Sequence, residues 1–192
     1  AHDVLDEAEA MLNAAIEKEP KERAKNVKRL RTVISTRADL FYKFFRIPEA
    51  IAEFRRLYDA DPKHEDALTA LRTAADLAFF NSNWDLAIQL YDDIIDLYGK
   101  KKDTIEERRK VDWRVQEVLQ RKGDIDGRIR RLKAFVDREG TDKMASRQVF
   151  RAYSIIANIY RARGDTKNEY KIWRQVLKAF EKGGFEKNGG PE

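Results

Sequence analysis

The sequence contains no cysteine and only two histidines, His2 and His64. Without cysteine the chain cannot form a disulfide, a thiolate zinc site or a cysteine nucleophile. Histidine is the usual acid–base residue near neutral pH, and the sequence has neither a His-Glu-x-x-His motif nor a glycine-rich phosphate loop. We therefore expect no enzymatic activity, no metal site and no cofactor.

Long uncharged segments are also missing. The longest stretch without a charged residue is nine residues, Ala152 to Tyr160, whereas a membrane-spanning helix needs about 20. The sequence does not begin with a basic segment followed by an apolar one, so we expect no signal peptide and no membrane insertion. The absence of cysteine gives a slight lean to a bacterial periplasm or envelope over the cytoplasm.

Glycine and proline are scarce, with 9 and 4 copies, and most lie between segments of apolar periodicity. Those segments have the spacing of helices, and none alternates as a strand does, which predicts an all-α protein. Gly123-Asp124 and Gly164-Asp165 each join a residue that ends a helix to one that caps the next.

Two further features concern how the helices begin and pair. Asp61 before Pro62 has the pattern of an N-cap followed by proline at the first helical position. Connections of two to four residues make neighbouring helices antiparallel. The expected hairpins pair 65–80 with 84–98, 106–121 with 125–138, and 144–163 with 167–182, while 4–19 forms a helix without an earlier partner.

A short pattern recurs along the chain: a small residue, an aromatic or leucine four positions later, and an apolar residue three positions beyond. Its small residues are 42 positions apart (8 to 50) and then 37 apart (50 to 87). A period of this length is typical of stacked helical hairpins. The three copies are Ala8, Leu12 and Ala15; Ala50, Phe54 and Leu57; and Ala87, Tyr91 and Ile94.

The repeated unit resembles that of the tetratricopeptide repeat (TPR) family, a helix pair with small residues and aromatics at set positions and a turn between them. The later equivalent positions 128 and 169 keep a spacing of 41, longer than the 34 usual for that family. Gln116 and Arg128 replace small residues in the most divergent unit. The residues that carry the resemblance best are Ala38, Phe41, Ala50, Phe54, Leu57 and Pro62; Ala75, Ala87, Tyr91 and Ile94; and Ala157, Tyr160, Gly164, Trp173 and Val176.

This resemblance implies a right-handed α-solenoid of antiparallel hairpins with about four and a half repeats over residues 1–182. The glycine-rich segment 183–192 is expected to be a flexible tail. Because the first helix carries the pattern of a second helix, we also expect the chain to be a fragment of a longer array.

In the resembled family the first helices of the hairpins line a concave groove that holds a peptide. Transferred by register, that groove would be basic and aromatic, which suits an acidic peptide with one or two apolar anchors. Phe79, Phe80 and Trp113 could instead pack against a neighbouring hairpin. The candidate binding residues are Tyr42, Lys43, Arg72, Phe79, Phe80, Lys110, Trp113, Arg114, Arg151 and Arg161.

Lys110 and Arg114 match two positions with which family members grip a C-terminal carboxylate. Ser35, Asp39 and Thr73 depart from that pattern, so capture of a chaperone tail is disfavoured. We predict a non-catalytic scaffold or adaptor that binds another protein.

Two alternatives remain open. RNA binding fits the formal charge of +5 and the pI of about 9.3, although 34 acidic residues oppose a continuous basic track. Self-association through the apolar ends of the solenoid is the other.

Overall fold

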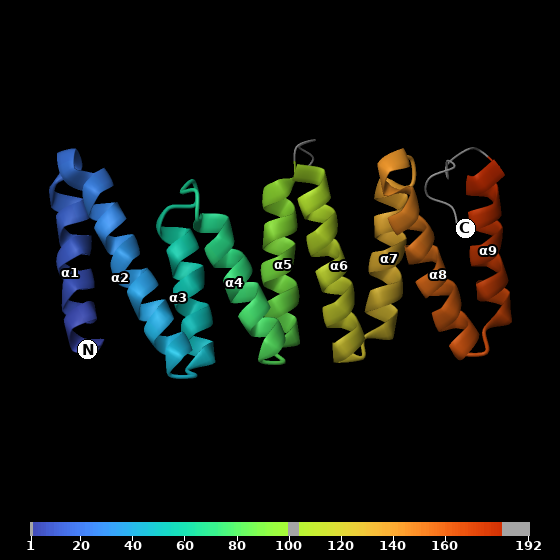
Figure 1. Ribbon diagram of the computed structural model, residues 1–192, viewed down its shortest axis with the longest axis horizontal. Helices are drawn as coiled ribbons and strands as arrows, with labels where there is room; N and C mark the ends of the chain where they lie inside the picture. Colours follow the sequence, from blue (N-terminus) through green and yellow to red (C-terminus); the bar gives the residue numbers. More distant parts are fainter. Residues whose placement is uncertain (1, 100–103, 182–192) are drawn as a thin grey trace. The chain divides into compact units, whose positions relative to one another are not determined.

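The computed structural model describes residues 2–99 and 104–181. These residues form α-helices and short 3-10 helices with no strand among them, which confirms the all-α prediction (Figure 1). The elements are α1 (His2–Lys18), η1 (Pro20–Glu22), α2 (Arg23–Lys43), α3 (Ile47–Ala60), α4 (Ala67–Phe80), α5 (Trp84–Tyr98), α6 (Ile105–Lys122), α7 (Ile125–Glu139), η3 (Lys143–Ala145), α8 (Ser146–Ala162) and α9 (Thr166–Glu181).

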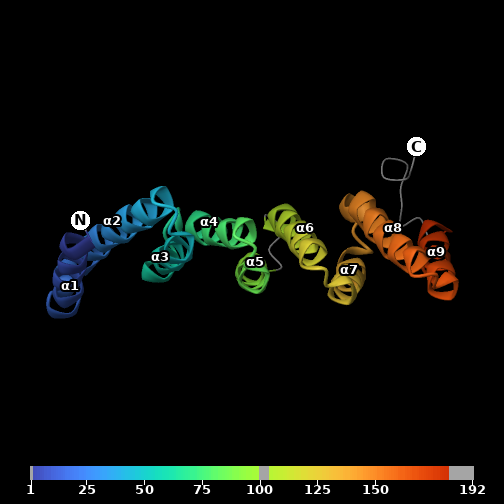
Figure 2. The same cartoon turned by 90° about the horizontal axis from the view of Figure 1, so that it is seen from below.

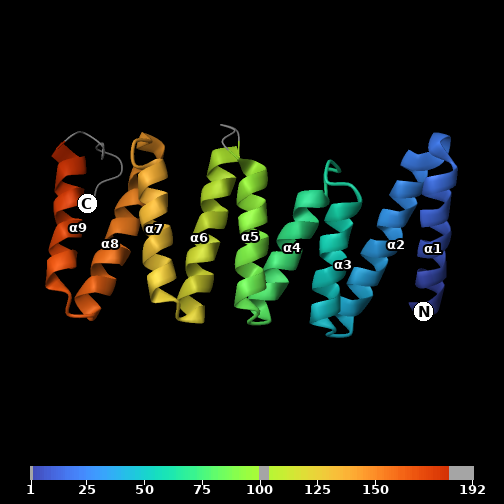
Figure 3. The ribbon, with the colours of Figure 1, turned by 180° about the vertical axis from the view of Figure 1, so that it is seen from behind.

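The chain divides into two compact units, residues 1–118 and 119–192. The tail predicted at 183–192 lies outside the described residues. In the first unit each of the helices α1 to α4 packs against the next helix along the chain (Figures 1 and 3). Helices α2 and α4 lie on one side and α3 and α5 on the other (Figure 2). In the second unit α7 packs on α8 and α8 on α9.

Small residues allow the helices of the first unit to approach closely. Ala74, Ala75 and Ala78 of α4 are fully buried, and alanine at a helix crossing leaves room for larger side chains of the facing helix. Tyr91 of α5 is buried too, and its hydroxyl donates to the carboxylate of Asp76 on α4. Burial and this hydrogen bond raise the pKa of Tyr91. In this hairpin the pattern residues Ala87, Tyr91 and Ile94 are therefore core positions.

An ion cluster around the buried side chains of Arg37 and Glu53 joins α1, α2 and α3. The Arg37 guanidinium lies 2.7 Å from the Glu9 carboxylate and 3.7 Å from that of Glu53, and Arg56 contacts both carboxylates. Burial alone would raise the pKa of Glu9, but the hydrogen bonds and charges of Arg56 and Arg37 outweigh it and lower that pKa. The cluster supplements the apolar packing of α1, whose Leu12 and Ile16 are only partly buried.

The same turn ends α2, α4, α6 and α8. In α2 the amide of Arg46 donates to the carbonyl of Phe41 at 2.8 Å, and the amide of Phe45 donates to that of Tyr42 at 3.0 Å. This is the Schellman pattern, and it places one residue in left-handed backbone. The left-handed residues are Phe45, Ser82, Gly123 and Gly164, with φ of 56°, 60°, 78° and 70°.

The two Gly-Asp predictions are confirmed. Asp124 accepts a hydrogen bond from the amide of Gly127 at 2.8 Å, and Asp165 accepts one from the amide of Asn168 at 3.1 Å. Each aspartate thus caps the helix that follows a left-handed glycine.

The prediction for Asp61 and Pro62 is wrong. Asp61 is the C-cap of α3, and α4 begins only at Ala67. The buried guanidinium of Arg31 donates to the carbonyls of Leu57 at 2.6 Å and Asp61 at 3.3 Å. This remote side chain satisfies the carbonyls at the end of α3, so the chain turns there before the next helix starts.

Candidate functional site

The candidate residues predicted from the sequence all lie on first helices of the hairpins. The first unit holds eight of them and the second unit holds two, and the two sets are separate sites here. They are Tyr42 and Lys43 on α2; Arg72, Phe79 and Phe80 on α4; Lys110, Trp113 and Arg114 on α6; and Arg151 and Arg161 on α8.

Several candidate cations are held by neighbouring side chains. Arg72 donates to the hydroxyl of Tyr98 at 2.7 Å and lies 3.5 Å from the carboxylate of Glu107. Lys110 binds the same carboxylate at 2.5 Å. The hydrogen bond from Lys110 lowers the pKa of Glu107. Arg72 thus links α4 to α5 and α6, whereas the pair of Lys110 with Glu107 lies within α6.

The other candidate cations differ in their surroundings. Arg114 pairs with Glu117 at 3.0 Å, and Arg161 pairs with Glu169 at 2.6 Å. Lys43 is exposed, and the structure shows no hydrogen bond or ion pair to it from any described residue. Its ammonium group is therefore available to a ligand.

The candidate aromatic residues are divided between core and surface. Phe79 is only 5% exposed, and its ring meets those of Phe80 and Trp84 edge-on at centroid distances of 5.3 and 5.8 Å. Phe80 is 75% exposed, Tyr42 is 53% exposed and Trp113 is half-buried. The ring of buried Phe79 thus packs against that of Phe80, which is exposed to solvent.

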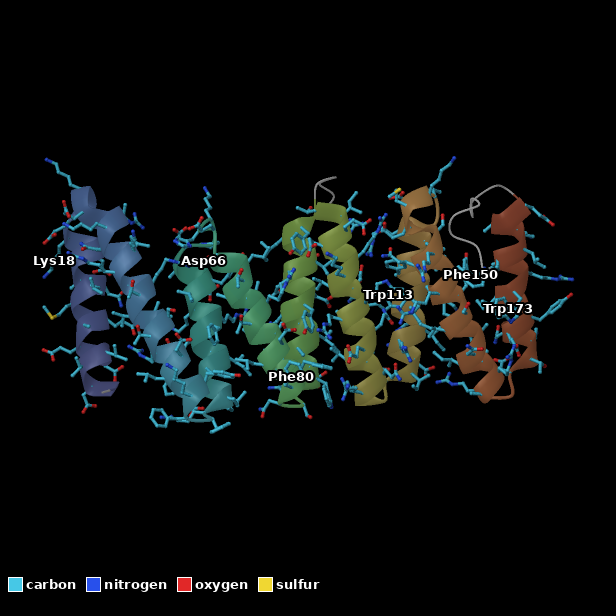
Figure 4. All side chains as sticks on the ribbon, in the orientation of Figure 1. Lys18, Asp66, Phe80, Trp113, Phe150 and Trp173 are labelled. Atoms are coloured by element: carbon cyan, nitrogen blue, oxygen red, sulfur yellow. The ribbon has the colours of Figure 1, made fainter. Side chains whose placement is uncertain are left out.

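Two hollows lie along the line where α2 faces α4. Asp66 and Phe80 mark the opposite ends of α4 in Figure 4, and one hollow lies near each. The hollow near Asp66 has a volume of about 440 Å³. It is lined mainly by hydroxyl-bearing and apolar side chains: Lys28, Arg31, Thr32, Ser35, Thr36, Phe54, Leu57, His64, Asp66, Thr69, Ala70 and Thr73.

The hollow near Phe80, which we call the end pocket, has a volume of about 400 Å³. It brings together three of the predicted residues, Tyr42, Lys43 and Phe80, with side chains from the α2–α3 turn. Its full lining is Tyr42, Lys43, Phe45, Ile47, Leu77, Phe80 and Asn81.

Sequence reasoning missed Phe44 and Phe45, which are 73% and 87% exposed beside this pocket. One signal could have found Phe45. It is 37 positions before Ser82, which is followed at steps of 41 by Gly123 and Gly164. A large aromatic therefore stands where two of the other three turns have glycine.

The second unit has its own hollow, of about 220 Å³, between α7, α8 and α9. Lys133 lies in its lining and donates to the Tyr160 hydroxyl at 3.1 Å. Burial, and then the charge of Asp137, raises the pKa of the Tyr153 hydroxyl in the same hollow. Arg151 and Arg161 do not line it.

His64 lies in the first hollow, where its Nδ1 accepts from the amide of Asp66 at 3.2 Å. Within the described ranges no group of three or more histidine, aspartate or glutamate side chains could hold a metal ion. None of the described helices is both long and apolar enough to cross a bilayer.

Comparison with known proteins adds structural likeness only. No protein family matches the sequence, and no curated protein does. The nearly identical TPR-like repeats of a Podosopora anserina protein described as a kinesin light chain match with a TM-score of 0.52 at 12% identity, covering 93% of this chain and 96% of that one. MamA matches with a TM-score of 0.44 at 15% identity, covering 93% of this chain and 90% of that one. A tetratricopeptide repeat protein from Parabacteroides merdae matches with a TM-score of 0.37 at 18% identity, covering 91% of this chain and 73% of that one.

The chain has a TPR-like helical-repeat fold. The likeness to the Podosopora repeats holds at 12% sequence identity, so it concerns the arrangement of the helices and leaves function to the surfaces of this chain. In a TPR-like arrangement α2 and α4 are first helices, and the two hollows described above lie between them.

Proposed function

We propose that this chain is a non-catalytic protein-interaction scaffold whose first unit binds a segment of a partner protein along α2 and α4. The observation that carries the proposal is the pair of hollows between these helices, one at each end of α4. Hollows of this kind accept side chains, and a segment that crosses both would bury apolar and polar groups together.

The side chains of the two hollows suit a protein better than a nucleic acid. The first hollow offers hydroxyl groups and the second offers aromatic rings. Arg72, Lys110 and Arg114 are each engaged by carboxylates of the same unit. Phosphate recognition needs cations free to neutralise the backbone. Each of these three already has a carboxylate partner, and Arg72 and Lys110 share that of Glu107.

Selection of peptides against the intact chain tests this proposal. A phage library of random peptides is panned on the immobilised protein, and the enriched peptides are synthesised and titrated. We then compare Thr69→Trp, which fills the first hollow, with Ala52→Trp, which adds the same bulk to an exposed site on α3. Circular dichroism establishes that both variants stay helical.

We expect Thr69→Trp to weaken peptide binding about tenfold or more, because a filled hollow cannot accept the peptide side chain. Ala52→Trp should leave affinity unchanged. Peptides that bind both variants equally well would place the binding surface elsewhere and contradict the proposal. Mixed single-stranded RNA that binds at low salt while no peptide is enriched would favour the RNA alternative instead.

A further inference from the structure

The end pocket contains a residue, Phe45, whose backbone conformation costs stability and whose exposed side chain contributes little to it. Phe45 has φ of 56° and is 87% exposed. Left-handed backbone brings the Cβ atom of any L-residue close to a carbonyl oxygen, so bulky residues are rare there. Ser82, Gly123 and Gly164 occupy the equivalent turns, where a small residue suffices. The turn itself therefore does not require phenylalanine.

The packing of the unit does not require this ring either. A phenylalanine that stabilises a fold does so by burial, and most of this ring faces solvent. A strained backbone residue that gains little from packing is a signature of a functional position. Its ring lines the end pocket, so the function that fits is contact with something that enters the pocket.

The surroundings of Phe45 extend the exposed apolar surface. Phe44, Phe80 and Tyr42 are 73%, 75% and 53% exposed and come from the ends of α2 and α4. The edge-on contact with buried Phe79 holds Phe80 in place. Clustered exposed aromatics at the rim of a concave site are typical of a surface that buries a partner's side chain.

Among the side chains that line the end pocket, Lys43 is the charged one. Arg46 is engaged, since it binds the Glu49 carboxylate at 2.7 Å and its guanidinium lies 4.6 Å from the centroid of the Phe41 ring. Lys43 lines the pocket without a partner among the described residues. A single lysine beside an apolar hollow complements one carboxylate next to one apolar group.

We propose that the end pocket takes one bulky apolar side chain of a partner peptide, of the leucine, methionine or phenylalanine class. An acidic residue next to that anchor pairs with Lys43. This inference rests on the proposed function and narrows it to an anchor site. A lipid surface fits less well, because a membrane is broad and attracts clusters of cations, whereas this site is hollow and has one available lysine.

Nuclear magnetic resonance of the ¹⁵N-labelled full chain tests the proposal. The probes are acetyl-Gly-Asp-Xaa-Asp-Gly amides in which Xaa is leucine, methionine, phenylalanine or alanine, titrated to millimolar concentration. A separate arm uses vesicles of phosphatidylcholine and phosphatidylserine. We expect saturable shifts of the amides of residues 42–47 and 77–82 with the three bulky peptides and not with the alanine peptide.

Three variants test which side chains of the chain bind the peptide. Phe45→Gly should weaken the bulky peptides about tenfold or more and change the thermal midpoint by no more than about 3 °C. Phe44→Ala removes an equally exposed ring that does not line the pocket, and it should leave affinity unchanged. Lys43→Gln should weaken the acidic peptides about twofold to fivefold and have no effect on probes in which both aspartates are replaced by asparagine.

Four results would overturn the inference. One is the absence of amide shifts at the end pocket while the selected peptides still bind the first hollow, near Ser35 and Thr69. In that case the proposed function would still hold. Another is equal peptide affinity in Phe45→Gly and the native chain. A third is a large fall in thermal midpoint in Phe45→Gly, which would make the ring structural. The last is binding of vesicles, lost in Phe45→Gly, without binding of any peptide.

Discussion

The left-handed turn after α2 gives a prediction about stability. At this position a glycine variant should be more stable than an alanine variant, the reverse of the usual order. In an exposed helix interior, replacing alanine by glycine costs about 1 kcal/mol. At position 45, where φ is 56°, alanine keeps the strain of left-handed backbone and glycine does not. Phe45→Gly should therefore fold more stably than Phe45→Ala, although both variants lose the ring.

The expected difference follows from two opposing contributions. Left-handed backbone costs a residue with a Cβ atom about 1 to 2 kcal/mol. Glycine loses about 0.4 to 1 kcal/mol more chain entropy on folding than alanine. Glycine at position 45 should thus be favoured by about 0.5 to 1 kcal/mol, around the difference of about 0.8 kcal/mol between the midpoints of these ranges.

The ring of Phe45 contributes little to the stability of the folded state. Phe45 is 87% exposed, and burying the remaining fraction of roughly 200 Å² is worth about 0.7 kcal/mol. The gain from this burial is similar to the net advantage of about 0.5 to 1 kcal/mol that glycine has at this position. Removing the whole side chain as Phe45→Gly should therefore leave stability nearly unchanged.

Hydrogen exchange at the turn measures the difference locally. The amide of Arg46 donates to the carbonyl of Phe41, so its exchange reports opening of the turn. We expect this amide to exchange about two to five times more slowly in Phe45→Gly than in Phe45→Ala, as about 0.5 to 1 kcal/mol requires. Ala52→Gly on exposed α3 is the matched control and should open more easily than the native chain. Equal or faster exchange in Phe45→Gly than in Phe45→Ala would refute the strain argument.

Three other predictions concern stability. Arg37→Ala removes a buried guanidinium that pairs with Glu9 and Glu53 while Arg56 still pairs with both, and it should destabilise the first unit by about 2 kcal/mol in urea titration. Arg46→Ala, which breaks an exposed pair, should cost less than about 1 kcal/mol, and similar losses would contradict the difference in burial. Because the folded-state pKa of Glu9 is lowered, its contribution is present above its unfolded pKa of about 4.3 and is lost as pH falls through the folded value. The acid-induced loss of stability should therefore be shallower in Glu9→Gln, and an unchanged profile would exclude this carboxylate as its source. Gly164→Ala places a Cβ with no atom within 4 Å, so calorimetry should show only the backbone cost of about 1 kcal/mol, and no change would mean that the turn had relaxed.

Local chemistry made most of the fold predictable. The helices follow from apolar spacing, and the turns at Gly123-Asp124 and Gly164-Asp165 follow from residues that act on their own neighbours. Such signals lie within a few positions of the chain, so one sequence contains them completely. The hairpin of α4 and α5 was predicted on this basis with boundaries close to the observed ones.

Features that depend on distant side chains were not predictable in the same way. Asp61 and Pro62 have the local pattern of a helix start, but Arg31 binds the carbonyls of this segment from 30 positions away. In the same way, the contact of Arg72 with Glu107 spans 35 positions. The resemblance predicted a groove position for this arginine, and it gave no sign of which carboxylate lies beside it.

The distribution of ion pairs bears on how a partner would be recognised. The residues transferred by register suggested a basic groove, yet Arg72, Lys110 and Arg114 form ion pairs within the first unit. Each pair reduces the field that a ligand would meet. The selectivity of α2 and α4 should consequently come from the shape and apolar character of the hollows, with Lys43 contributing one charge contact. A partner bound in this way would lose little affinity as salt concentration rises, in contrast to a ligand held by a track of cations.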